Sequence, residues 1–158
     1  MSLRAVAREA GVSQAAPYAH FADKRRLMSA IAAAGFLQLH AQLEAANADG
    51  AGSLRELGLA YLAFARENPG LYNLMFGPAD EIDSADEELV HAGRRAFDLL
   101  SKKCVPEGAD ARGDPRPIAA WSLVHGLAML SINHKLSPQA VALPPSEILD
   151  LLQCGIGA

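Results

Sequence analysis

Apolar residues recur along most of this chain at the three- and four-residue spacing of one helix face. In the stretch 53–67, for example, Leu54, Leu57, Tyr61 and Phe64 repeat at this spacing. Segments rich in Gly, Pro, Asn and Asp separate the apolar stretches. No stretch alternates convincingly as a strand does. The pattern therefore predicts an all-α fold, with helices over 3–10, 14–21, 24–46, 54–67, 71–76, 84–104, 117–136 and 144–152.

Several of these helices carry residues that suit their ends. Ser53, followed three positions later by Glu56, forms the capping-box pattern of a helix start. Acidic residues at 86–88 and lysines at 102–103 suit the dipole of the helix over 84–104. Gly155 is expected to end the last helix, because glycine adopts the left-handed conformation that a helix stop favours.

The first two predicted helices form a tight corner. Leu3, Val6 and Ala10 lie on one face of the first helix, Gly11 ends it, and Ser13 can cap the second. A close crossing with a short glycine-containing turn describes a helix-turn-helix, whose second helix lies in the major groove of DNA. Any two-helix corner with a glycine turn has the same spacing, so spacing alone leaves both interpretations open.

The residues of this corner resemble the TetR family of transcriptional regulators. The Tyr-x-His-Phe core of that family, with a lysine three residues later, stands here as Tyr18, His20, Phe21 and Lys24. The match covers residues 2–31 and is specific, because it requires particular residues rather than a periodicity. It favours the helix-turn-helix interpretation over the generic corner.

The resemblance also implies a domain organisation. A DNA-binding region would span 1–46, including a connecting helix, and a C-terminal ligand-binding and dimerisation domain would span 53–158. In the family, a further helix packs against this corner from its N-terminal side. The sequence has no such helix before Ser2, so we expect an incomplete and loosely packed head on a dimeric four-helix-bundle body.

The resemblance assigns DNA contacts to residues of the corner. Base edges would face Gln14, Ala15 and Ala16, and phosphates would be contacted by Ser2, Tyr18, His20 and Lys24. A glutamine can pair with adenine through two hydrogen bonds, whereas the two alanines offer only methyl groups. Pro17 removes a backbone donor, so an irregular first turn of the recognition helix is expected.

Charge is distributed unevenly along the chain. The net charge is −4. Residues 1–27 hold five basic and two acidic side chains, a net charge of +3, and the remainder therefore carries −7. Positive charge thus lies where phosphates would be met, which supports a DNA-binding role for the N-terminal segment.

A second motif lies about a hundred residues further along the chain. Trp121, His125 and Gly126 resemble the Trp-x-x-x-His-Gly signature of one TetR branch, and the segment 72–77 resembles what precedes it there. The body could enclose an apolar pocket with a few polar groups. Its candidate ligand-binding residues are Tyr61, Phe64, Tyr72, Met75, Phe97, Trp121, His125 and Met129, although an aromatic stripe at helical spacing is more often core packing.

A homodimer interface is expected on the last two long helices, as in the family. Gly126 lies in mid-helix, where glycine costs about 1 kcal/mol relative to alanine, and the close approach of another helix would explain it. The full set of interface candidates is Leu123, Gly126, Leu127, Leu130, Ile148, Leu151 and Leu152.

Other classes of protein are disfavoured. The five histidines and the cysteines Cys104 and Cys154 show no metal-binding or redox spacing, and no nucleophile and base arrangement is visible, so no enzyme, metal or cofactor is predicted. The longest uncharged run, 117–133, is short for a membrane span, and no signal segment is visible. We expect a cytoplasmic protein with reduced thiols and no membrane contact.

These observations predict a ligand-responsive transcriptional regulator. It would act as a repressor, bind a double-stranded DNA operator as a homodimer, and respond to a small apolar or amphipathic effector. The alternative is a small-molecule-binding helical dimer that has lost DNA binding through N-terminal truncation.

Overall fold

The computed structural model describes residues 8, 11, 13, 16–78, 80–105 and 113–156, without the side chains of 17, 18, 49 and 152–156. Helices dominate the described residues, among which there is no strand. The fold is therefore all-α, as the periodicity predicts. In chain order the elements are η1 (Ala16–Ala19), α2 (Lys24–Ala46), η2 (Ala48–Gly50), α3 (Leu54–Glu67), α4 (Pro69–Met75), α5 (Glu87–Cys104), α6 (Pro115–Ile132), α7 (Pro138–Val141) and α8 (Pro145–Ile156).

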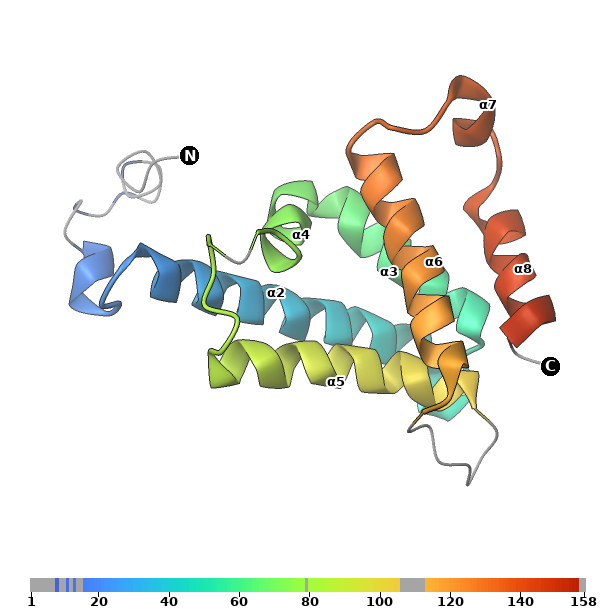
Figure 1. Cartoon of the computed structure of the whole chain (residues 1–158), viewed down its shortest axis with the longest axis horizontal. Helices are drawn as coiled ribbons and strands as arrows, with labels where there is room; N and C mark the ends of the chain where they lie inside the picture. Colours follow the sequence, from blue (N-terminus) through green and yellow to red (C-terminus); the bar gives the residue numbers. More distant parts are fainter. Residues whose placement is uncertain are drawn as a thin grey trace.

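Two long helices, α2 and α5, form the base of the body. Helices α2 and α5 lie side by side and run in the same direction, and their contact is the most extensive in the molecule (Figure 1). Helices α3 and α4 pack against α2, α6 packs against α3 and α5, and α8 packs mainly on α3. The element η1 lies at the far end of α2 from this body (Figure 1).

Side-chain caps explain where most helices begin. The Asp23 carboxylate accepts from the Arg26 amide at the start of α2, and Asp86 accepts from the Leu89 amide at the start of α5. Ser53 forms a complete capping box with Glu56, because its hydroxyl accepts from the Glu56 amide and its own amide donates to the Glu56 carboxylate. Each such cap stabilises a helix by about 1 kcal/mol.

Two of the predicted helices have the observed bounds, and the other described helices differ by one to four residues. Helices α2 and α3 agree, whereas α4 spans 69–75 rather than 71–76 and α5 begins at Glu87 rather than at 84. Helix α6 spans 115–132 rather than 117–136, and α8 spans 145–156 rather than 144–152. The short helix α7 was not predicted. The prediction that Gly155 ends the last helix is wrong, since α8 continues to Ile156. A glycine ends a helix only where the chain turns into the left-handed conformation.

The N-terminal corner is described at a few positions. Gly11 has φ +69°, the left-handed conformation predicted for a helix stop. The predicted second helix is present as the 3-10 helix η1, and the Ala16 amide bonds to the Ser13 carbonyl. Pro17 lies inside this short element, which agrees with the irregular first turn expected from a proline. The packing expected around Leu3 and Val6 lies outside the described residues.

Close approach at two glycines positions the helices of the body. A Cβ atom on Gly35 of α2 would lie 2.6 Å from the Met75 sulfur of α4, and one on Gly58 of α3 would lie 2.9 Å from Leu149 of α8. Leu149 and Tyr72 are completely buried. The missing side chains therefore let α4 pack against α2, and α8 against α3, with large apolar groups between them.

Candidate functional site

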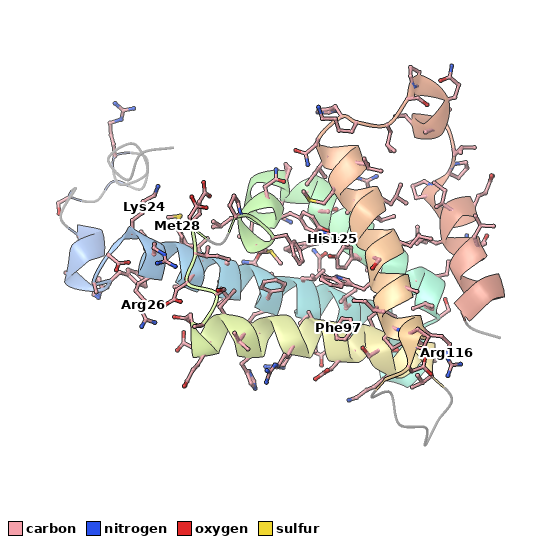
Figure 2. All side chains as sticks on the ribbon, in the orientation of Figure 1. Lys24, Arg26, Met28, Phe97, Arg116 and His125 are labelled. Atoms are coloured by element: carbon pink, nitrogen blue, oxygen red, sulfur yellow. The ribbon has the colours of Figure 1, made fainter. Side chains whose placement is uncertain are left out.

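An aromatic cavity lies between α2, α3, α5 and α6, and Phe97 of α5 lines it. His125 of α6 lies nearby without lining the cavity (Figure 2). The cavity volume is about 40 Å³. None of the described side chains that line it is charged, and five of them are aromatic. The lining residues are Phe36, Leu39, Leu43, Tyr61, Phe76, Gly93, Ala96, Phe97, Leu100 and Trp121.

Aromatic rings form a continuous cluster around this cavity. The Phe97 and Trp121 rings meet edge to face with centroids 5.8 Å apart, and the Phe36 and Phe76 rings do so at 5.2 Å. The His125 imidazole lies 4.4 Å from the Phe76 ring, also edge to face, and 5.5 Å from Trp121. Such pairs favour edge-to-face geometry because the ring edge is positive and the ring face is negative.

A polar triad borders the cluster. The Tyr72 hydroxyl oxygen lies 2.7 Å from Nδ1 of His125 and 2.9 Å from the Tyr61 hydroxyl oxygen, which is 3.1 Å from the same Nδ1. A neutral imidazole that accepts at Nδ1 carries its proton on Nε2. Only one hydroxyl can donate to Nδ1 at a time, so the other donates to its neighbouring tyrosine.

Burial sets the protonation of this triad. Desolvation raises the pKa of Tyr61 to about 12, although hydrogen bonds with Tyr72 and Trp121 act in the opposite direction. Desolvation also raises the pKa of Tyr72, and the neighbouring Tyr61 adds to the effect. The pKa of His125 is lowered because burial disfavours the charged imidazolium. At neutral pH the triad is therefore three neutral groups with two phenolic protons.

The predicted ligand-binding residues fall into three groups. Tyr61, Phe97 and Trp121 line the cavity. Tyr72 and His125 adjoin it through the triad and their ring contacts. The others serve packing: Phe64 is fully buried in the core, Met75 packs against Gly35, and Met129 lies against the core.

Seven lining residues are not among the predicted ones, and two of these seven, Phe36 and Phe76, are aromatic. Phe36 lies on α2, which the sequence identifies only as a connecting helix, and Phe76 follows the last residue of α4. Phe76 belongs to the 72–77 motif, so that motif could have indicated it. No local pattern indicates Phe36, because α2 is alanine-rich on all sides.

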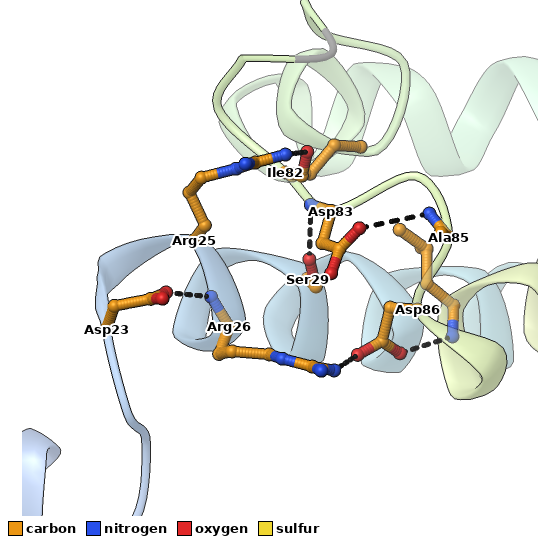
Figure 3. A network of polar contacts seen from close by, with 9 residues as sticks. Asp23, Arg25, Arg26, Ser29, Ile82, Asp83, Ala85 and Asp86 are labelled. Carbon is orange, nitrogen blue, oxygen red and sulfur yellow. Dashed lines mark hydrogen bonds and ion pairs between the residues drawn. The ribbon is translucent and has the colours of Figure 1, made fainter.

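The beginning of α2 is joined to the segment that precedes α5 by several polar contacts (Figure 3). The Arg25 guanidinium donates to the Ile82 carbonyl at 3.1 Å, and the Asp83 amide donates to the Ser29 hydroxyl at 2.8 Å. Arg26 forms an ion pair with Asp86 at 2.7 Å. Ser29 is fully buried, so its bond is shielded from water.

These contacts change the meaning of the N-terminal charge. Arg25 and Arg26 contribute two of the five basic residues in 1–27, and both bind the body in this structure. Arg26 also remains half exposed. Part of the N-terminal positive charge therefore binds within the chain, and a charge count could not reveal this because the partner Asp86 lies sixty residues from Arg26.

The predicted DNA-contact residues are described only in part. His20 and Lys24 are exposed, and Ala16 is half-buried. Lys24 is the first residue of α2, so the side chain stands where η1 joins the long helix. Ser2, Gln14, Ala15 and the Tyr18 side chain lie outside the described residues.

The predicted dimer-interface residues share a partly open apolar surface. Leu130 of α6 is 46% exposed and Leu151 of α8 is 68% exposed. Apart from the neighbouring backbone of its own helix, no atom of the described residues lies within 4 Å of a Cβ built on Gly126. Leu123, Leu127 and Ile148 are half-buried, and the side chain of Leu152 is not described. A hollow of about 310 Å³ between α3, α6, α7 and α8 adjoins Leu127 and Ile148.

Two further findings concern other classes of site. No group of three or more His, Cys, Asp or Glu side chains in the described part of the chain could hold a metal ion. No helix within these residues is long and apolar enough to cross a membrane.

Comparisons with known proteins match both ends of the chain. Residues 1–31 match the family model of bacterial regulatory proteins of the tetR family, and residues 54–152 match that of the tetracyclin repressor-like C-terminal domain. No curated protein matches the sequence.

Two solved structures share the fold. A protein of unknown function from Rhodococcus sp. RHA1 is 32% identical, with a TM-score of 0.74, over 100% of this chain and 86% of that chain. A candidate regulatory protein, SCO4313, has a TM-score of 0.77 at 20% identity, over 99% of this chain and 85% of that chain. At that identity the second likeness concerns the fold alone.

Proposed function

Because the chain belongs to the TetR family of bacterial regulatory proteins, we propose that it is a ligand-responsive, homodimeric repressor of transcription. Its role would be regulation in the cytoplasm rather than catalysis. DNA binding follows from membership of the family. Ligand response, repression and dimerisation are the additional properties that we propose for this chain. The Trp-x-x-x-His-Gly branch remains part of the proposal too.

One observation supports ligand response most directly. Helix α2 carries Lys24 at its first residue and Phe36, Leu39 and Leu43 in the cavity wall. At a rise of about 1.5 Å per residue, roughly 18 Å separates Lys24 from Phe36 along the helix. A tilt of about 5° around the cavity would therefore move the Lys24 end by roughly 2 Å. An occupant of the cavity could change how two heads fit an operator.

DNA binding would use the exposed end of the molecule. His20 and Lys24 can both donate to phosphate oxygens, and phosphate contacts fix the position of a protein on DNA. Gln14, Ala15 and Ala16 would face base edges, while Ser2 and Tyr18 would complete the phosphate contacts. These assignments carry over from the resemblance.

A fluorescence-anisotropy titration with duplex DNA from upstream of the gene tests DNA binding. We expect binding that weakens steeply with salt, because phosphate contacts release counterions. Lys24→Gln should reduce the slope of log affinity against log salt by about 1. Lys135→Gln, which alters an exposed lysine beyond the end of α6, should leave the slope unchanged. Absence of binding at low salt, with ligand binding retained, would instead favour the small-molecule-binding dimer.

Dimerisation would use the open apolar surface of α6 and α8. The space beside Gly126 is open among the described residues of one protomer, which suits a close approach by a helix of a second copy. Light scattering after size exclusion tests this. Leu130→Glu should yield monomers, whereas Leu37→Glu should not, although the two leucines are 46% and 45% exposed. Equal effects of the two variants would contradict the proposed interface.

A further inference from the structure

The cavity is too small in this structure for the kind of ligand that a regulator senses. A volume of about 40 Å³ holds one or two water molecules. A cavity of about 150 Å³ is needed for a molecule the size of benzene. A ligand must therefore enter by displacing part of the wall, and the chemistry of the wall restricts which ligands gain enough to do so.

Charge is the first restriction. The described side chains that line the cavity include no cation and no anion, and the nearest polar groups are the neutral triad. An ionised carboxylate or ammonium would lose its hydration there without gaining a partner of opposite charge. Burial of such an unpaired charge is costly enough to neutralise the group or exclude the ligand.

Shape is the second restriction. Phe36, Tyr61, Phe76, Phe97 and Trp121 surround the space, and several of these rings already meet edge to face. Phe36, Phe76, Phe97 and Trp121 are all only half-buried, and among them Phe97 and Trp121 face each other across α5 and α6 with ring centroids 5.8 Å apart. A planar aromatic ring placed between Phe97 and Trp121 would make edge-to-face contacts with both rings, in place of the contact that they lose with each other. A saturated ring of the same size has no aromatic face or edge, so it could not make these contacts.

The third restriction is a single polar position. Tyr61 is the only triad member that lines the cavity. In both proton arrangements of the triad its proton is used within the triad, and its oxygen keeps a lone pair. A ligand hydroxyl or N–H group in the cavity could therefore donate to the Tyr61 oxygen.

We propose that the effector is an uncharged, planar aromatic molecule with one hydroxyl or N–H group, bound between Phe97 and Trp121 with that group at Tyr61. This inference rests on the proposed function only in treating the cavity as the effector site.

Four two-ring probes separate these restrictions on the wild-type chain. They are 2-naphthol, naphthalene, decahydro-2-naphthol and 2-naphthoate, which differ in the hydroxyl, the planarity and the charge. Trp121 is the only tryptophan of the chain and lines the cavity, so its fluorescence reports occupancy. Expected affinities are highest for 2-naphthol, about two- to tenfold lower for naphthalene, and about a hundredfold or more lower for 2-naphthoate. Decahydro-2-naphthol should also bind at least several-fold more weakly than 2-naphthol.

Two matched pairs of variants test the position. Tyr61→Phe should abolish the preference for 2-naphthol over naphthalene, whereas Tyr72→Phe, which removes the neighbouring hydroxyl outside the lining, should retain it. Gly93→Leu fills the cavity and should abolish binding, whereas Gly70→Leu, at an open position in α4, should not. If a variant fails to fold, the probe series on the wild-type chain still decides the class of ligand.

Several results would overturn the inference. Equal affinities for 2-naphthol and 2-naphthoate, or for 2-naphthol and its saturated analogue, would contradict the class of ligand. Binding that survives Gly93→Leu would contradict the position. The anisotropy titration keeps this inference separate from the proposed function. A chain that binds DNA but no probe refutes the ligand, and one that binds 2-naphthol but no DNA refutes the regulator.

Discussion

The Tyr61–Tyr72–His125 triad leads to a prediction about stability, because its two phenolic protons serve one acceptor nitrogen. Either tyrosine can donate to Nδ1 of His125, from 2.7 Å for Tyr72 and 3.1 Å for Tyr61. Removing one hydroxyl leaves the other to donate. Removing both leaves a polar nitrogen among aromatic rings without a donor. The two deletions should therefore be strongly non-additive.

The magnitude follows from the contacts that each change removes. Tyr72→Phe or Tyr61→Phe alone removes one net hydrogen bond, which costs about 0.5–1.5 kcal/mol of unfolding free energy. The double variant removes both hydroxyls and also strands Nδ1, whose loss of a partner adds about 1–3 kcal/mol. We therefore expect the double variant to cost at least about 1 kcal/mol more than the sum of the single variants.

Urea denaturation followed by circular dichroism measures these differences at one fixed chain concentration, since a dimer makes stability depend on concentration. A shared slope against urea would show that the variants unfold between comparable states. His125→Phe in the double-variant background supplies the control. This substitution removes the nitrogen that lacks a donor, so it should restore part of the lost stability. If the histidine served only to fill space, the same substitution would restore no stability.

Additivity would refute this reasoning. If the double variant costs the sum of the single variants within about 0.5 kcal/mol, the tyrosines do not substitute for one another. The hydroxyls would then bind separate partners, and the proton arrangement described for the triad would be wrong. Additivity would also contradict the inference that the Tyr61 oxygen keeps a free lone pair for a ligand.

Three further predictions follow from burial. Because the pKa of His125 is lowered in the folded chain, the unfolded chain takes up a proton at this residue first as the pH falls below 6.5. The unfolding free energy should therefore decrease as the pH falls below 6.5, and His125→Phe should reduce the slope of unfolding free energy against pH. Burial raises the pKa of Cys104 to about 11 and its thiol donates to a carbonyl of α5, so at pH 8 mass spectrometry should find it alkylated slowly in the folded chain and rapidly in guanidinium. Ser29→Ala removes the acceptor of the Asp83 amide, so hydrogen exchange at that amide should accelerate while exchange in the middle of α5 does not change.

The sequence predicts a helix start well where a full capping box marks it. Ser53 with Glu56 sets the start of α3 in this way, because a side chain and an amide three residues apart decide the boundary. A single acidic cap is not enough, since α5 begins after Asp86 and not at the predicted position 84. The prediction fails where the boundary depends on the rest of the fold. Gly155 stays helical, and α7 forms in a segment whose prolines resemble a loop, with Ser137 capping it through the Ala140 amide.

In the candidate site too, the sequence predicts features set within one helix and not those set by the packing of the chain. Tyr61, Phe97 and Trp121 were predicted because apolar periodicity and a family motif select positions within single helices. Arg25 and Arg26 were assigned to the DNA-facing charge because composition gives their sign and not their partners. Those partners, Ile82 and Asp86, lie 57 and 60 residues away, and only the packing of the chain brings them to the start of α2.

Phe36 shows why the cavity itself could not be predicted. Phe36 lies on α2 and Gly93 on α5, and only the packing of these two helices places the Phe36 ring 3.8 Å from a Cβ built on Gly93, an ordinary contact distance. Glycine in mid-helix costs about 1 kcal/mol relative to alanine. Because an alanine would fit without displacing Phe36, Gly93→Ala should stabilise the chain while narrowing the space for a ligand. A stabilising change that weakens effector binding would be evidence that this position serves the cavity rather than the fold.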